Sequence, residues 1–340
     1  MNKLFVALFF GLLLPPLSWG RLSYEEMKHA LPNEYEILGE QTFQHLFRIL
    51  ELSNSRTDSP QACQGRLTLT TATPITTGDV TAATTVYFTP ASGNKISLYS
   101  GSRWQLLAFT QVSVAVPSTT TTPFDVFAYN NSGTLTLETT DWTNDTTRAT
   151  ALTTQNGVSV KSGSTTRRYL GTLRTTGVSG QTEDSVQKRF LWNECNRVPR
   201  KLLAQSSTDS WTYTSASWRS ANNTTTTGVT RVEFLVGRAT DLMELEVYVP
   251  LVGNTGATAV AAGIGINSTT ANSANNFGAT AGVIANGVYG TALGTYRAVP
   301  SVGYSYGQWL EASVASGTST WYTFSAANYR QGGLTGQIWQ

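Results

Sequence analysis

The chain's best candidates for catalytic chemistry are two adjacent carboxylates, Glu183 and Asp184. Paired carboxylates cleave glycosidic bonds, one acting as an acid and the other as a base or nucleophile. Adjacent residues of a β-strand point to opposite faces, so both side chains can reach one sugar only from a loop. An ion pair or loop-end contact with Arg167, Arg168 or Lys188 is the simpler interpretation, and it is the one we expect.

A second stretch has the letters of a serine nucleophile. Gly303-Tyr304-Ser305-Tyr306-Gly307 matches Gly-x-Ser-x-Gly, a motif that needs a strand before it, a helix after it and a histidine downstream. The only histidines, His29 and His45, lie upstream, so we interpret the match as chance. The sequence also lacks a phosphate-binding loop and a two-histidine metal motif. It therefore predicts no enzyme activity, no catalytic residue, no metal and no cofactor.

The two cysteines, Cys63 and Cys195, are too few for a disulfide framework and have no neighbours that would complete a metal site. A single bridge between distant parts of the chain is one interpretation. The other, which we prefer from the sequence, is that they are independent thiols. Replacing both with serine is then expected to leave stability and assembly nearly unchanged.

Aromatic side chains are the remaining candidates for binding. Rigid tyrosine and tryptophan rings stack on sugars and supply contact area at low entropic cost. A group of them near the C-terminus is the predicted receptor or glycan site: Tyr304, Tyr306, Trp309, Trp321 and Tyr322. The alternative is that they belong to the core, since Trp309-Leu310 and Trp321-Tyr322 would each point one member inward in a strand.

The composition favours β-structure with hydroxyl-rich outer faces. Charged residues make up 13% of the 340-residue chain, against roughly 25% in ordinary globular proteins. The net charge of +2 is uninformative about partners at the level of the whole chain, and we expect no nucleic-acid partner. Nine Lys and Arg residues gather between Lys161 and Lys201. We expect them to form a solvated face, with some arginines paired to buried acids.

The N-terminal residues differ from the rest of the chain. Residues 1–20 form an apolar leader like a secretory signal, with Lys3 before the run Leu4–Leu14 and Ser18-Trp19-Gly20 after it. Whether the leader is cleaved stays open. Residues 21–60 are predicted to be a helical attachment or oligomerisation segment followed by a linker, with capping-box spacing at Ser23-Tyr24-Glu25-Glu26.

From Gly65 onward the hydrophobic period is two, which predicts strands. Hairpins are expected where Ser100–Arg103, Asn130–Gly133 and Ser162–Ser164 interrupt the alternation. Residues 61–202 and 203–340 are predicted to be two antiparallel β-sandwich or jelly-roll-like domains, so the fold class is all-β after a short helical segment. Loops are expected at 222–227 and 267–279, and a strand around Val288.

Four stretches of the first β region follow one another in a distinctive order: GRLTLTTATPITTGDVTAATTVYFTP from Gly65, ISLYSGSRWQLLAFT from Ile96, FDVFAYNNSGTLTLETTDWTNDTTRATAL from Phe124, and the block from Arg148 to Leu202. Together they resemble tail-fibre-like virion proteins of tailed bacteriophages and prophages. The resemblance covers about residues 63–202 and weakens beyond them. It implies a receptor-facing or accessory fibre component, generally trimeric, and supplies no catalytic residue that can be transferred to this chain.

The sequence thus predicts a fibre-like structural component of a virion, located on the virion surface and acting in host attachment or particle decoration. Its expected partners are two further copies of itself, other virion proteins through the N-terminal segment, and a host-surface glycan or protein. The leader supports an alternative, a secreted bacterial adhesin or glycan-binding module. A glycan depolymerase is a third possibility, and only Glu183 and Asp184 speak for it.

Overall fold

The structure is a computed structural model that describes Thr42, Gln44, His45 and residues 59–254, 258–284, 287–314, 317–324 and 330–340. The chain separates into two compact units, Met1–Asp58 and Ser59–Gln340. Thr42, Gln44 and His45 are helical. The rest of the expected helical segment and the whole apolar leader lie outside the described residues, so those two expectations stay predictions.

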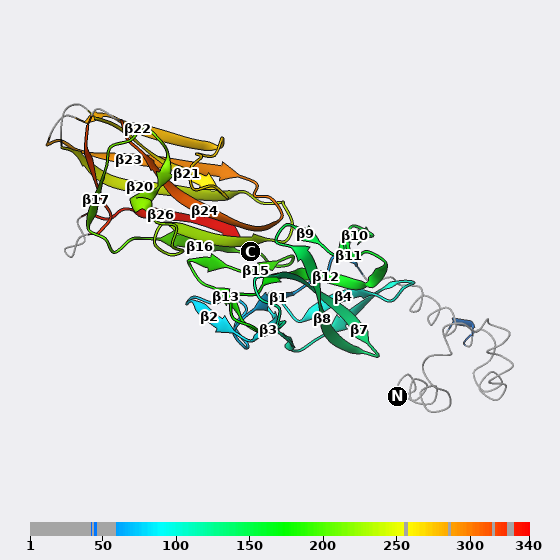
Figure 1. Cartoon of the computed structure of the whole chain (residues 1–340). Helices are drawn as coiled ribbons and strands as arrows, with labels where there is room; N and C mark the ends of the chain where they lie inside the picture. Colours follow the sequence, from blue (N-terminus) through cyan, green and yellow to red (C-terminus); the bar gives the residue numbers. More distant parts are fainter. Residues whose placement is uncertain are drawn as a thin grey trace. The chain divides into compact units, whose positions relative to one another are not determined.

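The unit Ser59–Gln340 is all-β, as the period-two alternation predicts (Figure 1). Its described residues form strands β1–β26 and one short 3-10 turn, η2 (Ala221–Asn223). All strand pairs but one are antiparallel among those described, the exception being β14 (Lys188–Arg189) with β19 (Arg231–Val236). Antiparallel neighbours that follow one another in the chain need only tight turns between them.

The first part of this unit contains three small sheets. The three-stranded sheet runs in the order β1 (Gly65–Thr68), β3 (Thr85–Pro90), β6 (Val112–Ala115). A two-stranded sheet pairs β4 (Lys95–Tyr99) with β5 (Trp104–Ala108). The seven-stranded sheet consists of β10 (Leu152–Gln155), β11 (Val158–Lys161), β12 (Ser164–Arg174), β7 (Pro123–Asn131), β8 (Thr134–Asn144) and β9 (Thr147–Arg148), with β15 (Leu191–Asn193) beside β12.

The three predicted hairpins are confirmed. β4 pairs with β5 across Ser100–Arg103, β7 with β8 across Ser132-Gly133, and β11 with β12 across Ser162-Gly163. Gly133 and Gly163 have positive φ angles of 94° and 75°. Glycine adopts that conformation without steric cost, so the chain can reverse direction at these two positions and the alternating strand residues stop there.

The second part is built on a fourteen-stranded sheet that returns around a core. Its main path is β16 (Pro199–Ala204), β26 (Gly333–Trp339), β20 (Met243–Gly253), β23 (Tyr289–Ala298), β22 (Asn276–Ile284), β21 (Thr258–Ile266), β24 (Gly303–Ala312), β19 (Arg231–Val236), β14 (Lys188–Arg189), β13 (Thr182–Asp184) and β2 (Val80–Ala83). Three further strands attach to it: β17 (Ser210–Tyr213), β18 (Arg219–Ser220) and β25 (Ser319–Tyr322).

Two hydrophobic clusters form the interior. The N-terminal core takes its residues from β1 to β15, with Phe88, Val126 and Leu173 among them. The C-terminal core lies between β16-β26-β20-β23 on one side and β21-β24-β19 on the other, with Leu245 and Ile264 from opposite sides. Strands that bury alternate residues against a second layer have β-sandwich character. The division into domains at residues 202 and 203 stays a prediction.

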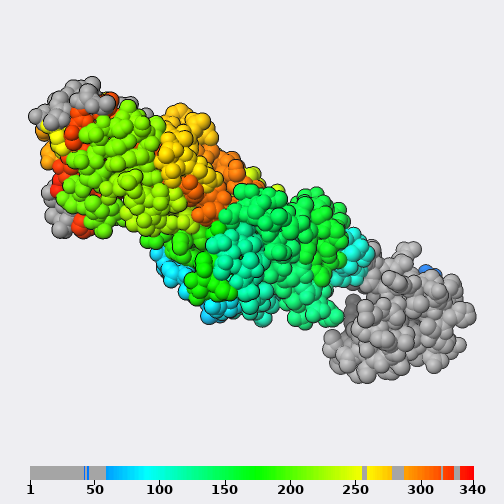
Figure 2. All heavy atoms as spheres, viewed as in Figure 1, coloured from blue at the N-terminus to red at the C-terminus, as the bar shows by residue number. Residues whose placement is uncertain are grey.

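The seam between residues 59–198 and 199–340 is closely bonded. The parallel pairing of β14 with β19 carries one sheet from the C-terminal part into β13 and β2. Gly237 lies so near the N-terminal core that a Cβ there would stand 2.2 Å from the Tyr169 hydroxyl. Figure 2 shows the green surface of the first part in direct contact with the yellow-green and orange surface of the second. The two parts therefore form one compact unit.

Two local expectations need correction. The tract 267–279 is not a loop throughout, because β22 begins at Asn276. Gly287 and Val288 lie between β22 and β23, so the strand expected over GVIANGVYG around Val288 is interrupted there, although its two ends belong to these strands. Alternation predicted β21 and β23 in approximately the right regions. It did not predict where β22 begins, because the polar residues before it, such as Asn272 and Ser273, have the composition of a loop. Their side chains accept hydrogen bonds from the backbone N–H groups of Ile264 and Ile266.

The expectation of independent thiols is wrong. Cys63 and Cys195 form a disulfide, with their Cα atoms 6.1 Å apart. Asn193 brings them together, since its amide accepts from Leu67 N at 2.6 Å and donates to Leu67 O at 3.2 Å. Asn196 adds donors to the carbonyls of Cys63 and Gly65. The segment after β15 thus lies along β1, a contact that no spacing in the sequence reveals.

Replacing Cys63 and Cys195 with serine is therefore expected to destabilise the protein, contrary to the expectation from sequence. The bridge joins residues 132 positions apart. Loop-closure entropy for a loop of that length predicts a loss of about 5 kcal/mol. Chemical denaturation of the oxidised chain and the double serine variant measures the difference. A change below about 1 kcal/mol would show that the bridge contributes little, and non-reducing peptide mapping verifies that the bridge is present in the parent.

Candidate ligand-binding face

Two members of the predicted aromatic site are core residues. Trp309 of β24 and Trp321 of β25 both have 0% exposure and belong to the C-terminal core. Trp309 packs edge-on against Trp211, with ring centroids 5.6 Å apart. No ligand at the surface can touch either ring, so their assignment as binding residues is corrected. Strand alternation accounts for Trp321, whose neighbours Thr320 and Tyr322 are partly exposed, whereas the strand around Trp309 is buried on both faces.

Tyr304 and Tyr306 share one face of β24, but both are covered by arginines. The guanidinium of Arg174 lies 3.9 Å from the centroid of the Tyr304 ring, and Phe190 packs against its edge at 6.0 Å. Arg231 covers Tyr306, also at 3.9 Å. Burial raises the pKa of Tyr304 above its ordinary value. These tyrosines serve cation–π packing, and Tyr304 is part of the seam.

Tyr322 is partly exposed, as Tyr304 and Tyr306 are, but it lies beside an exposed ring of the same sheet. It is half-buried, with its ring 6.2 Å from that of Tyr289 and 4.2 Å from the Arg330 guanidinium. It faces the same side of the sheet as Thr320, which is paired with Val252 of β20. Since paired and alternate residues share a face, the neighbours of Tyr322 can be read from the strand register.

The register brings three more aromatic rings to this face. Tyr289 is opposite Val252, Tyr248 is opposite Leu293, and Phe277 is opposite Thr295. Tyr248 is 47% exposed, Tyr289 65% and Phe277 78%. The alternate residues of β20, from Met243 to Leu251, are buried in the C-terminal core. We call the set Tyr248, Phe277, Tyr289 and Tyr322 the outer aromatic face.

The chemistry available on the outer aromatic face is stacking and hydrogen bonding. Thr291 and Thr295 of β23 lie among the rings, and the ion pair Glu244–Arg297 at 3.4 Å is exposed. From Tyr289 to Leu293 the face extends roughly 14 Å along β23 at about 3.4 Å per residue. Such a surface suits the apolar faces and hydroxyl groups of a glycan. Tyr248, Phe277 and Tyr289 were not identified from the sequence, because alternation does not tell which face of a strand is exposed.

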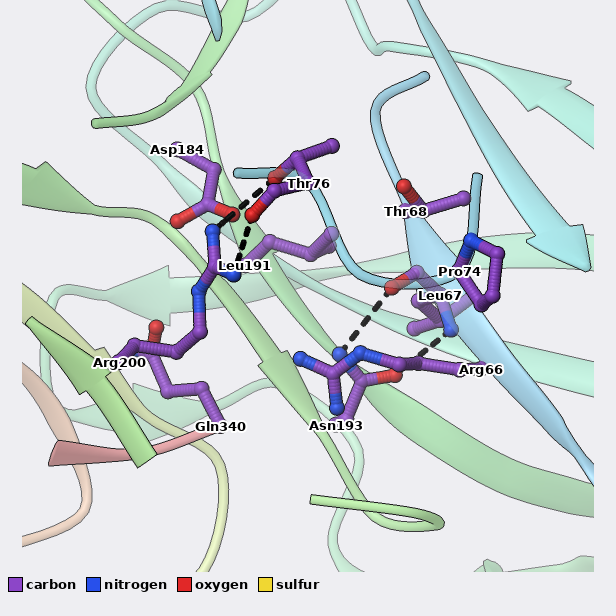
Figure 3. A pocket seen from close by; sticks show the side chains of 10 residues that line it. All are labelled: Arg66, Leu67, Thr68, Pro74, Thr76, Asp184, Leu191, Asn193, Arg200 and Gln340. Atoms are coloured by element: carbon purple, nitrogen blue, oxygen red, sulfur yellow. Dashed lines mark hydrogen bonds and ion pairs between the residues drawn. The ribbon is translucent and has the colours of Figure 1, made fainter. Parts of the chain in front are cut away.

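Two hollows in the unit are alternative places for a ligand. One is a small cavity of about 10 Å³ lined by polar residues that include Arg66, Asp184 and Arg200 (Figure 3). The other is a groove of about 500 Å³ beside Arg148, Leu152 and Arg238. Arg148 donates to Asp125 at 2.6 and 3.2 Å and to Gly237 O at 2.7 Å, and Arg238 pairs with Glu194. Both arginines that line the groove are therefore already paired with acids of the protein itself.

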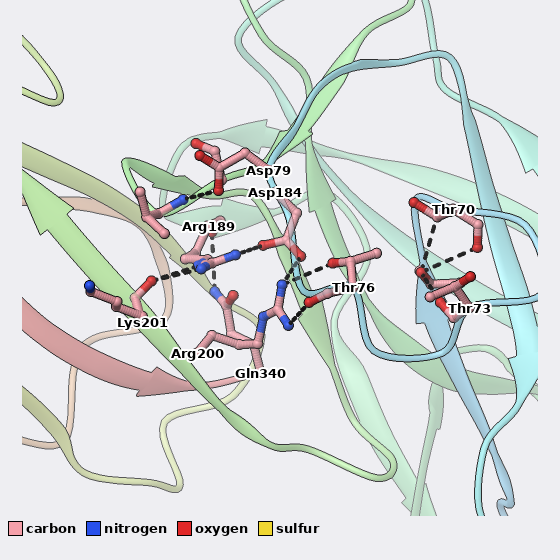
Figure 4. Close-up of polar contacts among 12 residues, drawn as sticks. Thr70, Thr73, Thr76, Asp79, Asp184, Arg189, Arg200, Lys201 and Gln340 are labelled. Atoms are coloured by element: carbon pink, nitrogen blue, oxygen red, sulfur yellow. Dashed lines mark hydrogen bonds and ion pairs between the residues drawn. The ribbon is translucent and has the colours of Figure 1, made fainter.

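The carboxylate pair is engaged in ion pairs, which confirms the expected contact with Lys188. Glu183 lies 3.2 Å from Lys188 Nζ. Asp184 accepts from Arg189 at 2.7 Å and from Arg200 at 3.0 Å (Figure 4). Both carboxylates are in β13, with side chains 9% exposed for Glu183 and 12% for Asp184. Neither is placed to meet a sugar.

Glu311 is a carboxylic acid that the sequence analysis did not single out. It has 0% exposure, accepts from Trp211 Nε1 at 2.6 Å and from Asn222 N at 3.1 Å, and pairs with Arg219 at 2.8 Å. Burial raises its pKa to about 7, although these partners lower it. A perturbed acid is a common mark of an active site, but this one is enclosed by its own partners and supports the packing of β17 and β18 on β24.

The part of the chain that the structure describes offers no metal site and no membrane span of the helical kind. There, no three His, Cys, Asp or Glu side chains gather as a metal ion would require. No described helix has the length and apolarity to cross a membrane.

Comparisons with known proteins give little guidance. Neither the protein-family models nor the curated proteins contain a match to the chain. Among solved structures, the chain is similar to the insecticidal delta-endotoxin Cry8Ea1 from Bacillus thuringiensis, with a TM-score of 0.23 and 8% identity over 82% of this chain and 52% of the toxin. It is also similar to a structure of infectious bursal disease virus Gx strain, with a TM-score of 0.20 and 10% identity over 84% of this chain and 82% of that one. The chain spans about half the length of the endotoxin, and likeness at this level carries no argument about function.

The raised pKa of Glu311 predicts a pH-dependent stability. The folded chain holds this proton up to about pH 7, whereas the unfolded carboxyl releases it near 4.5. Between these values the folded state binds more protons, so the free energy of unfolding falls as pH rises, by roughly 3 kcal/mol in all. Chemical denaturation between pH 4.5 and 8 measures this slope.

The test variant is Glu311→Gln, and the control is Val178→Ala, an exposed change that removes no ionisable group. Glutamine at 311 cannot titrate and should remove its share of the slope, even if its amide fits Arg219 poorly and lowers stability at every pH. The control should leave the slope unchanged. Identical pH profiles for the parent and Glu311→Gln would contradict the assignment.

Proposed function

We propose that this chain is a fibre-like structural component of a tailed-bacteriophage virion that contacts the host surface through the outer aromatic face. The observation that carries the proposal is the group of four aromatic rings, Tyr248, Phe277, Tyr289 and Tyr322, on the solvent side of a sheet. Single exposed apolar residues are ordinary, but several exposed rings on one face of a sheet, two of them in contact, favour an interaction site. The resemblance of residues 63–202 to fibre proteins supports the virion setting.

The proposal includes finer points of organisation. Residues 61–202 and 203–340 would act as two sandwich-like domains, and residues 21–60 would join the chain to other virion proteins. A homotrimer is the proposed assembly, because sheets of low charge have few lysines with which to protect their edges. The chain would be non-enzymatic and would work without a cofactor or nucleic acid.

The alternative is a secreted bacterial adhesin or glycan-binding module. The Cys63–Cys195 disulfide favours it, since disulfides persist in oxidising surroundings outside the cytoplasm. A virion protein would acquire the bridge only after release from the cell. Labelling of phage particles with antibodies to the Ser59–Gln340 unit tests the virion setting, and labelling of the bacterial surface in phage-free cultures would favour the alternative. The mature N-terminus, at Met1 or Arg21, separates them further.

Removing rings from the outer aromatic face is expected to weaken attachment. The double variant Phe277→Ala and Tyr289→Ala deletes two highly exposed rings, each worth roughly 1–2 kcal/mol in a stacking contact. Binding to host-cell surfaces should fall at least tenfold, with melting temperature nearly unchanged because both side chains are solvated. Val178→Ala, an exposed substitution in the first part of the unit, is the control. Undiminished binding by the double variant would exclude this face.

Sedimentation equilibrium of the full-length protein is expected to give a homo-oligomer, with a trimer as the preferred state. Packing copies around an axis covers sheet edges that a single copy leaves open. A monomer at concentrations on the order of tens of micromolar, where most specific assemblies are complete, would reject the trimer. It would also favour the secreted binding module over the fibre component.

A further inference from the structure

The small cavity at the seam has an unusual charge balance. Its walls come from β1, the 74–76 loop, β13, β15, β16 and the C-terminal residue Gln340 (Figure 3). Its volume is about 10 Å³. A hollow of this size holds one water molecule or one monatomic ion of slightly larger radius, but no polyatomic ligand.

Arg66 enters this cavity without an acid of its own. It is 4% exposed, and its Nη1 donates to Asn196 O at 2.6 Å while its Nε is buried without a partner. Burying a cation in this way is expensive unless a counter-charge lies close. Burial, together with the positive charge of Arg200, lowers the pKa of Arg66 to about 10, although the negative charge of Asp184 acts in the opposite direction.

Arg200 lines the cavity from β16, and its ion-pair partner Asp184 is shared with Arg189. It is 8% exposed and lies 3.0 Å from Asp184, with Thr76 O accepting a further hydrogen bond at 2.7 Å. Asp184 also serves Arg189 at 2.7 Å. Asp79, whose charge acts on Arg200, accepts from Val186 N at 2.8 Å. Three guanidinium groups thus face two carboxylates, which leaves one positive charge in excess.

We propose that a small monovalent anion of halide size, chloride under ordinary conditions, binds in this cavity between Arg66 and Arg200. It supplies the missing negative charge and accepts hydrogen bonds from guanidinium donors on β1 and β16. The bound ion links the N-terminal core to the strand that begins the C-terminal part. A neutral water is the competing occupant, because it would donate to the buried Gln340 Oε1, which has no partner. Water leaves the charge excess in place.

Bromide distinguishes the two occupants, since it replaces chloride and scatters anomalously. Crystals of the full-length protein soaked in sodium bromide should show an anomalous peak inside the cavity. In solution, raising sodium chloride at constant ionic strength against sodium gluconate should raise the melting temperature by on the order of 5 °C. A cavity that shows electron density for a water but no anomalous peak in the parent protein would overturn the proposal.

Two variants test whether the chloride-specific rise in melting temperature comes from this cavity. Arg66→Met removes the uncompensated charge and should abolish both the bromide peak and the chloride-specific rise. Arg297→Gln, a change at a residue whose side chain is 69% exposed, should leave both intact. If Arg66→Met does not fold, the bromide map of the parent still decides the matter. A chloride-specific rise that persists in a folded Arg66→Met variant would also count against this site.

Discussion

The fold of Ser59–Gln340 depends on one buried carboxylate, Asp184, held between Arg189 and Arg200. Buried ion pairs gain little over apolar packing, but removing one partner leaves an uncompensated charge and costs about 3–5 kcal/mol. Here the loss would spread through the seam. Arg189 also donates to Lys201 O at 3.0 and 2.8 Å, and its own carbonyl accepts from Gln340 Nε2 at 3.1 Å. β14, β16 and the chain's last residue are therefore positioned by the same group.

This use of charge shapes the rest of the surface. Several arginines of the unit are committed to acids near the seam, with Arg148 on Asp125, Arg174 on Asp145 and Arg238 on Glu194. In a chain with only 13% charged residues, few remain for the outer faces of the sheets. Those faces carry threonine and aromatic side chains instead. The exposed rings of β20, β22 and β23 lie on one of these outer faces, beside the exposed ion pair Glu244–Arg297.

The sequence predicted the local structure better than the contacts between distant segments. Alternation and turn glycines are local properties, so the hairpins at Gly133 and Gly163 were predicted correctly. The Cys63–Cys195 bridge depends on Asn193 meeting Leu67, which alternation does not encode. Of the predicted binding residues, Trp321 faces the core and Tyr322 faces the solvent. The sequence alone allowed either residue to be a core residue or a binding residue. Period two gives the two faces of a strand but not which one is buried.

The position of the outer aromatic face on strands has a consequence for how it would bind. Rings fixed on a sheet lose little conformational freedom on binding, but an open face without a pocket excludes water poorly and leaves much of a ligand solvated. Each copy would then bind a surface glycan weakly. Several linked copies facing one cell surface raise the effective concentration of the remaining sites, which multiplies affinity without any new contact. An oligomeric fibre would supply this multiplicity, so assembly and attachment depend on each other physically in the proposed function.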